Sequence, residues 1–147
     1  MSILYADTSA LIRAYFADEP DHDELHKLLI EGDEPVVASE LARVEFASAV
    51  TSAFRANRIT DGERVRTRFD ADCGEDGVFT LLRLDPETTL PVAYNLVTTH
   101  QLRTLDAIHV AVALTDVATL AAGEPVTFVT RDHRQAAAAQ ANGLTVL

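Results

Sequence analysis

The feature that most constrains this chain is the alternation of short apolar runs with longer helical patterns. Five runs have the length and apolar character of strands, and they span residues 3–6, 36–38, 78–84, 126–130 and 145–147. The run VTFVT at 126–130 is rich in β-branched residues and is the clearest strand, whereas 78–84 is either a strand or a transition from helix to strand. Strands separated by helices predict an α/β fold, in which a parallel sheet carries helices on both faces.

Seven helical patterns accompany these runs. They span residues 9–16, 21–30, 39–56, 60–72, 86–100, 105–122 and 134–142. Ser39 and Thr60 are the expected N-caps of the third and fourth helices, and Glu63 follows Thr60 at the spacing of a capping box. Gly143 stands where a helix-ending glycine is typical. Residues 73–77 (CGEDG) are interpreted as a loop inside the domain.

The composition favours a single domain that spans residues 1–147. Of these 147 residues 48% are hydrophobic, so the chain can bury a substantial core. No stretch approaches the roughly 20 apolar residues of a membrane-spanning helix, and the first residues lack the basic flank and cleavage site of a signal peptide. The single cysteine, Cys73, excludes an internal disulfide and a multi-cysteine zinc site, and no tight histidine pair suggests zinc instead. We therefore expect a cytoplasmic protein that does not engage a membrane.

The charges are unevenly distributed. A net charge of −11 argues against sequence-independent binding to phosphate backbones through many Lys and Arg contacts. Acids crowd one early segment: Asp18, Glu19, Asp21, Asp23, Glu24, Glu31, Asp33 and Glu34. Arginines crowd a later one: Arg55, Arg58, Arg64, Arg66 and Arg68. Such blocks are either solvated helix faces or, for the arginines, a surface for a polyanion or an acidic partner.

Two acids stand just after strands. Asp7 follows the run at 3–6, and Asp132 follows the run at 126–130. Each could simply be the N-cap of the next helix. In a parallel α/β sheet, however, ligands bind beyond the carboxyl ends of the strands, which is where both acids are expected.

Two further acids lie inside helical patterns where packing alone would not require them. Glu45 falls on or beside a core stripe formed by Leu41, Val44, Ala47, Ser48 and Val50. Asp106 opens the apolar helix at 105–122, where an acid in the first turn also suits the helix dipole. A charged acid near a core face costs free energy unless it is paired or binds a metal.

A metal site would use all four acids together. Clustered carboxylates repel one another and destabilise the fold until a cation neutralises them. Mg²⁺ prefers oxygen ligands and keeps several waters, so a few carboxylates suffice. One or two Mg²⁺ or Mn²⁺ ions at such a site would suit phosphodiester hydrolysis, because the metal lowers the pKa of a bound water and stabilises the leaving oxygen.

Four motifs follow one another along the chain: Asp7-Thr8-Ser9-Ala10-Leu11, Ser39-x5-Glu45, Leu102-Arg103-x2-Asp106-Ala107-x-His109-x-Ala111 and Phe128-Val129-Thr130-x-Asp132. In this order they resemble the PIN-domain ribonucleases, and most of all the VapC toxins of bacterial toxin–antitoxin pairs. The resemblance covers nearly the whole chain, up to the closing Gly143-Leu144-x-Val146. Each motif is weak alone, and their order makes the resemblance specific.

The resemblance implies a three-layer α/β/α sandwich and an endoribonuclease that uses Mg²⁺ or Mn²⁺ to cleave structured RNA. Asp7, Glu45, Asp106 and Asp132 match the family's four acids, as metal ligands and catalytic residues. Supporting roles are implied for Thr8, Ser9 and Thr130. A toxin of this type would be a homodimer, held inactive by a VapB-type antitoxin whose C-terminal segment covers the acidic pocket.

Four arginines are expected RNA contacts: Arg55, Arg58, Arg103 and Arg131. Arg131 replaces the Asn that usually precedes the last acid in the family, and Arg103 could instead form an ion pair at a helix start. His109 lies three residues after Asp106, on the same helix face, and we expect it to be packed or hydrogen-bonded rather than a general base.

Two other functions are consistent with parts of the pattern. A non-catalytic RNA- or protein-binding module of this fold would have no need of a carboxylate cluster. An aspartyl-phosphate hydrolase would use Asp7 as its nucleophile, but Ser9 occupies the position where such enzymes commonly carry a second acid.

Overall fold

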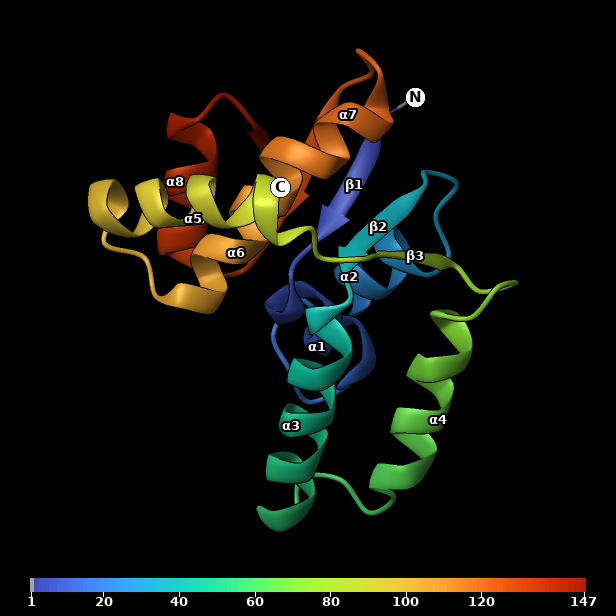
Figure 1. The fold of residues 1–147 in the computed structure, drawn as a ribbon. Coiled ribbons are helices and arrows are strands. Elements are labelled where there is room, and N and C mark those ends of the chain that lie inside the picture. The colour runs from blue at the N-terminus through green and yellow to red at the C-terminus, as the bar shows by residue number, and fades with distance from the viewer. Residues whose placement is uncertain (1) are drawn as a thin grey trace.

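The fold is built on a five-stranded parallel sheet. A computed structural model describes residues 2–147. The strands are β1 (Ile3–Ala6), β2 (Val36–Ser39), β3 (Phe79–Leu82), β4 (Val126–Val129) and β5 (Thr145–Val146), and they lie in the order β3-β2-β1-β4-β5 (Figure 1). Every pairing is parallel, with Leu4 opposite Val36 and Ala6 opposite Val129. The predicted α/β class is confirmed, and the ambiguous run at 78–84 does contain a strand.

Side chains alternate across this sheet and feed two separate cores. Leu4 and Ala6 point into one core, whereas Tyr5 between them points into the other. In β4, Val129 likewise packs in the first core and Phe128 in the second. A sheet that is buried on both faces requires helices on both, and this accounts for the three-layer α/β/α architecture.

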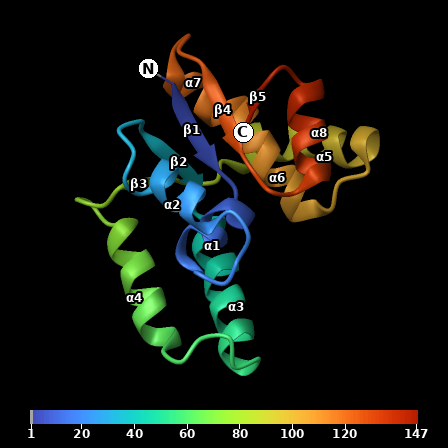
Figure 2. The same cartoon turned by 180° about the vertical axis from the view of Figure 1, so that it is seen from behind.

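The first core is covered by the helices of the first half of the chain. These are α1 (Thr8–Tyr15), α2 (His22–Leu29), α3 (Leu41–Arg55) and α4 (Gly62–Asp72). Figures 1 and 2 show α3 and α4 extending together from the sheet as a two-helix arm. Phe46 of α3 and Phe69 of α4 stack with their ring centroids 3.9 Å apart and join the two helices.

The second core is covered by the helices that follow β3. These are α5 (Pro86–His100), α6 (Thr104–Val112) and α8 (His133–Ala141), and the short helix α7 (Ala118–Ala121) follows α6. A π-helical turn, η1 (Ala113–Val117), joins α6 to α7. The single helix expected at 105–122 is therefore interrupted by one wider turn.

The continuous run Thr104–Ala121 is a helix long and apolar enough to cross a membrane by length and composition, with a mean hydropathy of 1.4. The expectation that no stretch approaches this length was therefore too strict. In the structure the run packs as a core helix, because residues 107–113 are all buried in the second core.

The helix starts differ from expectation at two places. Asp61, not Thr60, caps α4, and its carboxylate accepts the Arg64 N–H. Ser39 Oγ accepts the Leu41 N–H at 3.2 Å, but Glu40 occupies the N-cap position of α3. At α3 the Ser39 hydroxyl therefore still supplies the capping oxygen, as expected, whereas at α4 the favoured cap residue Asp61 replaces the neighbouring Thr60.

Candidate active site

The candidate site lies where the order of the strands reverses. The chain builds β1, β2 and β3 outward to one edge of the sheet and then returns to place β4 on the other side of β1. Because Ala6 pairs with Val129, Asp7 and Thr130 are the next residues along two adjacent parallel strands. Ligands in open α/β sheets bind in the crevice at such a reversal.

A cavity of about 570 Å³ opens at this point, and all four predicted acids line it: Asp7, Glu45, Asp106 and Asp132. Thr8, Ser9 and Arg103 also contribute to its wall, as do His109 and Gln135. The structure thus gathers acids from four different elements into one cavity.

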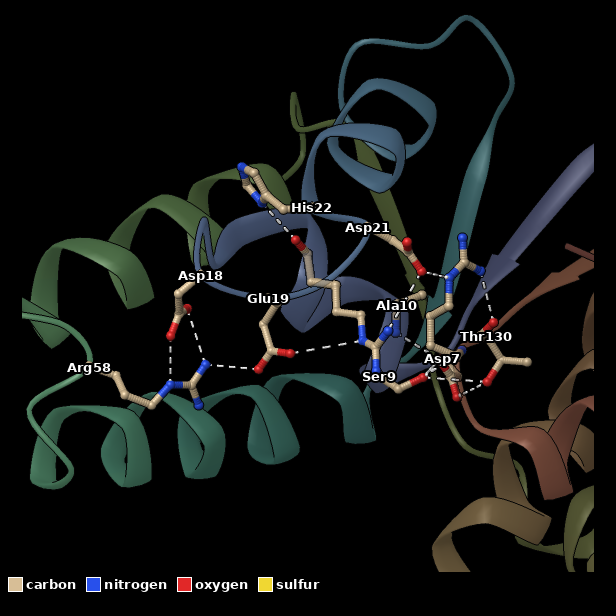
Figure 3. A network of polar contacts seen from close by, with 11 residues as sticks. Asp7, Ser9, Ala10, Asp18, Glu19, Asp21, His22, Arg58 and Thr130 are labelled. Atoms are coloured by element: carbon tan, nitrogen blue, oxygen red, sulfur yellow. Dashed lines mark hydrogen bonds and ion pairs between the residues drawn. The ribbon is translucent and has the colours of Figure 1, made fainter.

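Asp7 is the most deeply placed of the acids. It is 2% exposed, and its Oδ1 accepts the Ala10 N–H at 3.0 Å, so it caps α1. Ser9 Oγ donates to the same oxygen at 2.7 Å, and Thr130 Oγ1 donates to Oδ2 at 2.7 Å (Figure 3). Burial outweighs these three hydrogen bonds and raises the pKa of Asp7 above its usual value. The cap role and a ligand role are compatible, because a cation would offset the cost of this buried charge.

Asp132 also caps a helix. Its Oδ1 accepts the N–H groups of Arg134 and Gln135, both at 2.9 Å, at the start of α8. Thr130 Oγ1 accepts the Asp132 N–H at 3.0 Å and thereby holds the turn that follows β4. Thr130 is thus hydrogen-bonded to both Asp7 and Asp132, and the supporting role expected of it has a geometric basis.

Glu45 lies at the edge of the buried face of α3. The predicted core stripe was right only in part, because Val50 is buried but Val44 is 72% exposed, and the other buried residues are Ala42, Phe46 and Ala53. Glu45 Oε1 lies 2.5 Å from His109 Nε2 and accepts the Thr8 hydroxyl at 2.9 Å. Burial opposes ionisation of Glu45, but the hydrogen bond and electrostatic attraction from the His109 side chain, together with the Thr8 hydroxyl, outweigh burial and lower the pKa of Glu45.

His109 joins Glu45 to the interior of the protein. The imidazole is 1% exposed, and its Nδ1 lies 2.6 Å from the Tyr5 hydroxyl. Burial raises the pKa of Tyr5, so this hydroxyl keeps its proton. His109 is hydrogen-bonded on both ring nitrogens, as expected of a structural histidine, and it holds the Glu45 carboxylate from the protein side.

Gln135 is a site residue that the sequence analysis missed. It is 2% exposed, its Nε2 donates to Asp106 Oδ1 at 3.1 Å, and its Oε1 lies 3.2 Å from Thr130 Oγ1. Gln135 therefore connects Asp106 to the Asp7–Thr130 pair. Its position three residues after Asp132 fits a capping box, and that spacing was the available signal.

The four arginines expected to contact RNA are placed differently from one another. Of these four, Arg103 alone lines the cavity within residues 2–147; its side chain is 80% exposed, and its Nε lies 3.3 Å from Asp106 Oδ2. Arg131 Nε donates to Asp21 at 2.9 Å, and its guanidinium also pairs with Glu24. Arg58 forms ion pairs with Asp18 and Glu19 (Figure 3), and Arg55 is exposed at the end of α3. These contacts leave Arg103 best placed to meet a ligand in the cavity.

The donor set suits a hydrated Mg²⁺ or Mn²⁺ ion. All four candidate ligands are carboxylates, which are the oxygen donors that these ions prefer. Among residues 2–147, no three His, Cys, Asp or Glu side chains are grouped closely enough to hold one ion together. Mg²⁺ does not need such a group, because it typically takes one or two carboxylates directly and keeps several waters.

Comparison with solved structures shows the same fold. The chain is similar to PAE2754 from Pyrobaculum aerophilum, with 18% identity and a TM-score of 0.68 over 99% of this chain and 89% of that one. It is also similar to VapC20 from Mycobacterium tuberculosis, a sarcin-ricin loop cleaving toxin, with 17% identity and a TM-score of 0.69 over 97% of this chain and 96% of that one. No curated protein matches the sequence. The model of the PIN domain matches residues 4–141. The chain therefore belongs to the PIN-domain family.

Proposed function

We propose that this protein is a metal-dependent endoribonuclease that acts as the toxin of a toxin–antitoxin pair. The observation that carries the proposal is the convergence of Asp7, Glu45, Asp106 and Asp132 on one cavity at the strand-order reversal. A binding module would have no reason to bury Asp7, whose carboxylate is costly to ionise there.

In this proposal the four acids hold Mg²⁺ or Mn²⁺. When bound, such an ion supplies an activated water and neutralises charge on the phosphate. Ser9 and Thr130 fix both oxygens of Asp7, and Gln135 fixes Asp106. His109 and Thr8 orient Glu45 and keep it ionised. Arg103 stands at the cavity wall, where its exposed guanidinium can bind a phosphate oxygen.

The toxin assignment rests on the family and on the fold shared with VapC20, which is itself a toxin. By analogy we propose a cytoplasmic homodimer that cleaves structured RNA. Its inhibitor would be a small VapB-type antitoxin whose C-terminal segment covers the acidic cavity. A short upstream reading frame that encodes a DNA-binding N-terminus would support this pairing.

The nuclease is tested with purified protein that is free of antitoxin. In Mg²⁺ or Mn²⁺ it should cleave cellular RNA at defined sites, and Asp7→Asn, Glu45→Gln, Asp106→Asn and Asp132→Asn should each abolish cleavage. Ser52→Ala, an exposed change on α3, is the matched control. Absence of cleavage by wild-type protein in both metals would overturn the activity, and sequencing the RNA ends would identify the target.

The toxin is tested in cells. Induction of the wild-type protein should arrest growth, and Asp7→Asn should relieve the arrest at equal protein level. If the protein cuts RNA in vitro but never slows growth, the nuclease activity is supported and the toxin function is refuted.

A further inference from the structure

A second group of potential metal ligands lies on α2, away from the four acids of the candidate active site. His22 and His26 are one helical turn apart, so their side chains share one face of the helix. Their ring centroids are 5.6 Å apart. The expectation that the chain has no tight histidine pair is therefore wrong for this helix.

The two imidazoles are held in the same way. His22 Nδ1 lies 2.7 Å from the backbone carbonyl of Arg13, and His26 Nδ1 lies 2.9 Å from that of Ala14. Both carbonyls belong to the last turn of α1, where intrahelical partners are missing. A carbonyl only accepts hydrogen bonds, so Nδ1 must carry the hydrogen in both rings.

This arrangement prepares both rings to bind a metal. With the hydrogen on Nδ1, the neutral imidazole presents its lone pair on Nε2. A bond from Nδ1–H to a backbone carbonyl is the usual way in which proteins fix the tautomer and direction of a metal-binding histidine.

The pair also faces open space rather than packed protein. His22 and His26 line a cavity of about 850 Å³ between the α1–α2 pair and α4. Its charged lining groups are Asp61, Glu63, Arg64 and Arg68, two acids and two arginines. Glu31 Oε1 lies 3.7 Å from His26 Nε2, so an oxygen donor is already beside one of the two nitrogens.

We propose that His22 and His26 form a binding site for a late first-row transition-metal ion, namely Ni²⁺, Cu²⁺ or Zn²⁺. Imidazole nitrogens suit these ions, whereas Mg²⁺ prefers oxygen. No three-residue His, Cys, Asp or Glu cluster occurs within the described part of the chain, so water or an added ligand completes the coordination.

This site is distinct from the acidic one. The cavity around His22 and His26 shares no lining residue with the cavity around Asp7. Figure 3 shows the His22 ring and the Asp7 carboxylate at well separated places, with His22 turned toward the end of α1. The proposal therefore does not depend on the nuclease function.

The test uses tag-free, full-length protein in excess Mg²⁺, which occupies the oxygen sites. Ni²⁺ binding is measured by calorimetry, and Cu²⁺ coordination is measured by electron paramagnetic resonance. The informative variants are His22→Asn and His26→Asn. The Asn amide can still donate to the Arg13 or Ala14 carbonyl, but it lacks the Nε2 ligand. His100→Gln, outside this cavity, is the matched control, and Asp7→Asn separates the two sites.

Wild type, His100→Gln and Asp7→Asn should bind one Ni²⁺ equally, with nitrogen hyperfine splitting from two imidazoles on Cu²⁺. Each Asn variant should bind at least about tenfold more weakly, a change of about 1.4 kcal/mol, while its melting temperature in chelator stays at the wild-type value. The proposal is overturned if wild type shows no nitrogen coordination, or if both Asn variants keep wild-type affinity. If an Asn variant melts early, His22→Gln and His26→Gln provide the second test of the same loss.

Discussion

At the scale of single residues, Asp7 has two opposite effects on the free energy of unfolding. As the N-cap of α1 it stabilises the helix, but as a buried carboxylate it is costly to ionise. Sites of this kind commonly exchange stability for function. Substitution of Asp7 can therefore measure how much stability the protein loses by keeping this carboxylate.

We predict that Asp7→Asn is more stable than wild type in chelator. Asn retains a cap oxygen for the Ala10 N–H and removes the buried charge, so the free energy of unfolding should rise by on the order of 1 kcal/mol. The raised pKa sets the pH dependence. The gain is largest where Asp7 is ionised and shrinks toward acidic pH, where protonated Asp7 no longer carries this cost.

Urea denaturation of both proteins across pH measures this gain. Asp132→Asn is the control, because its carboxylate is less buried and should show a smaller change. An Asp7→Asn protein that is less stable than wild type at neutral pH would contradict the prediction.

Gln135 should behave as a positioning residue. Gln135→Ala removes the links to Asp106 and Thr130, and we expect cleavage to fall about 10- to 100-fold, as for other residues that orient metal ligands. The Mg²⁺ concentration for half-maximal activity should rise in parallel. Gln140→Ala, exposed on the same helix, is the control, and an unchanged Mg²⁺ midpoint in Gln135→Ala would refute the role.

Cys73 should be a slow nucleophile. Burial is the largest influence and raises the pKa of its thiol to about 11, so little thiolate exists at neutral pH. Alkylation by iodoacetamide at pH 8 should be much slower in the native protein than in urea, and it should accelerate toward pH 11. Equal rates in the folded and unfolded protein would count against this prediction.

The sequence located the acids more readily than their neighbours. Asp7 and Asp132 follow apolar strand runs, and that rule is enough to place them at one edge of a parallel sheet. Glu45 was placed through a core stripe that matches the structure at Val50 but not at Val44, because 3.6-residue periodicity fixes a helix face only approximately. Gln135 was missed, because its capping-box spacing after Asp132 indicates only a local contact at the helix start, whereas its bond to Asp106 joins distant parts of the chain.

At the scale of elements, the α3–α4 arm depends on an aromatic contact. Phe46 and Phe69 are each 1% exposed, and Tyr15 of α1 packs edge-on against both rings. We predict that Phe69→Ala lowers the free energy of unfolding by about 3–5 kcal/mol, the usual range for emptying a core aromatic position.

Denaturant titration checks this prediction. Phe54→Ala on α3 is the matched control, because Phe54 is 53% exposed and its loss should cost far less. Comparable losses for the two variants would show that the stacked pair is not what holds the arm.

The helices and strands themselves were largely predictable, because hydrophobic periodicity and β-branched composition are each evident over many consecutive residues. The π-helical turn Ala113–Val117 was not. The turn packs against α5 and β4, and such long-range contacts cannot be read from the local sequence.

At the scale of the whole molecule, the net negative charge of the protein disfavours binding of the proposed RNA substrate. The net charge of −11 repels RNA, and Arg103 faces four acids in the cavity wall. We predict that kcat/KM for RNA rises with added KCl at fixed Mg²⁺, because salt screens repulsion beyond a Debye length of about 10 Å at 0.1 M.

Initial rates at a series of KCl concentrations measure this effect, with Arg103→Gln for comparison. That variant should be slower throughout, and its rate should rise more steeply with salt. A steady fall in wild-type kcat/KM with salt, which is typical of proteins that bind RNA through basic surfaces, would contradict the prediction.

The return of the chain from β3 to β4 has a consequence for biosynthesis. The hydrogen bond between Thr130 and Asp7 joins residues 123 positions apart, and Asp132 lies beyond it. A ribosome-bound chain that has made β1, β2 and β3 possesses Asp7 and Glu45 but neither Thr130 nor Asp132. The four acids therefore cannot come together during most of translation, and an unfinished polypeptide lacks the complete candidate site.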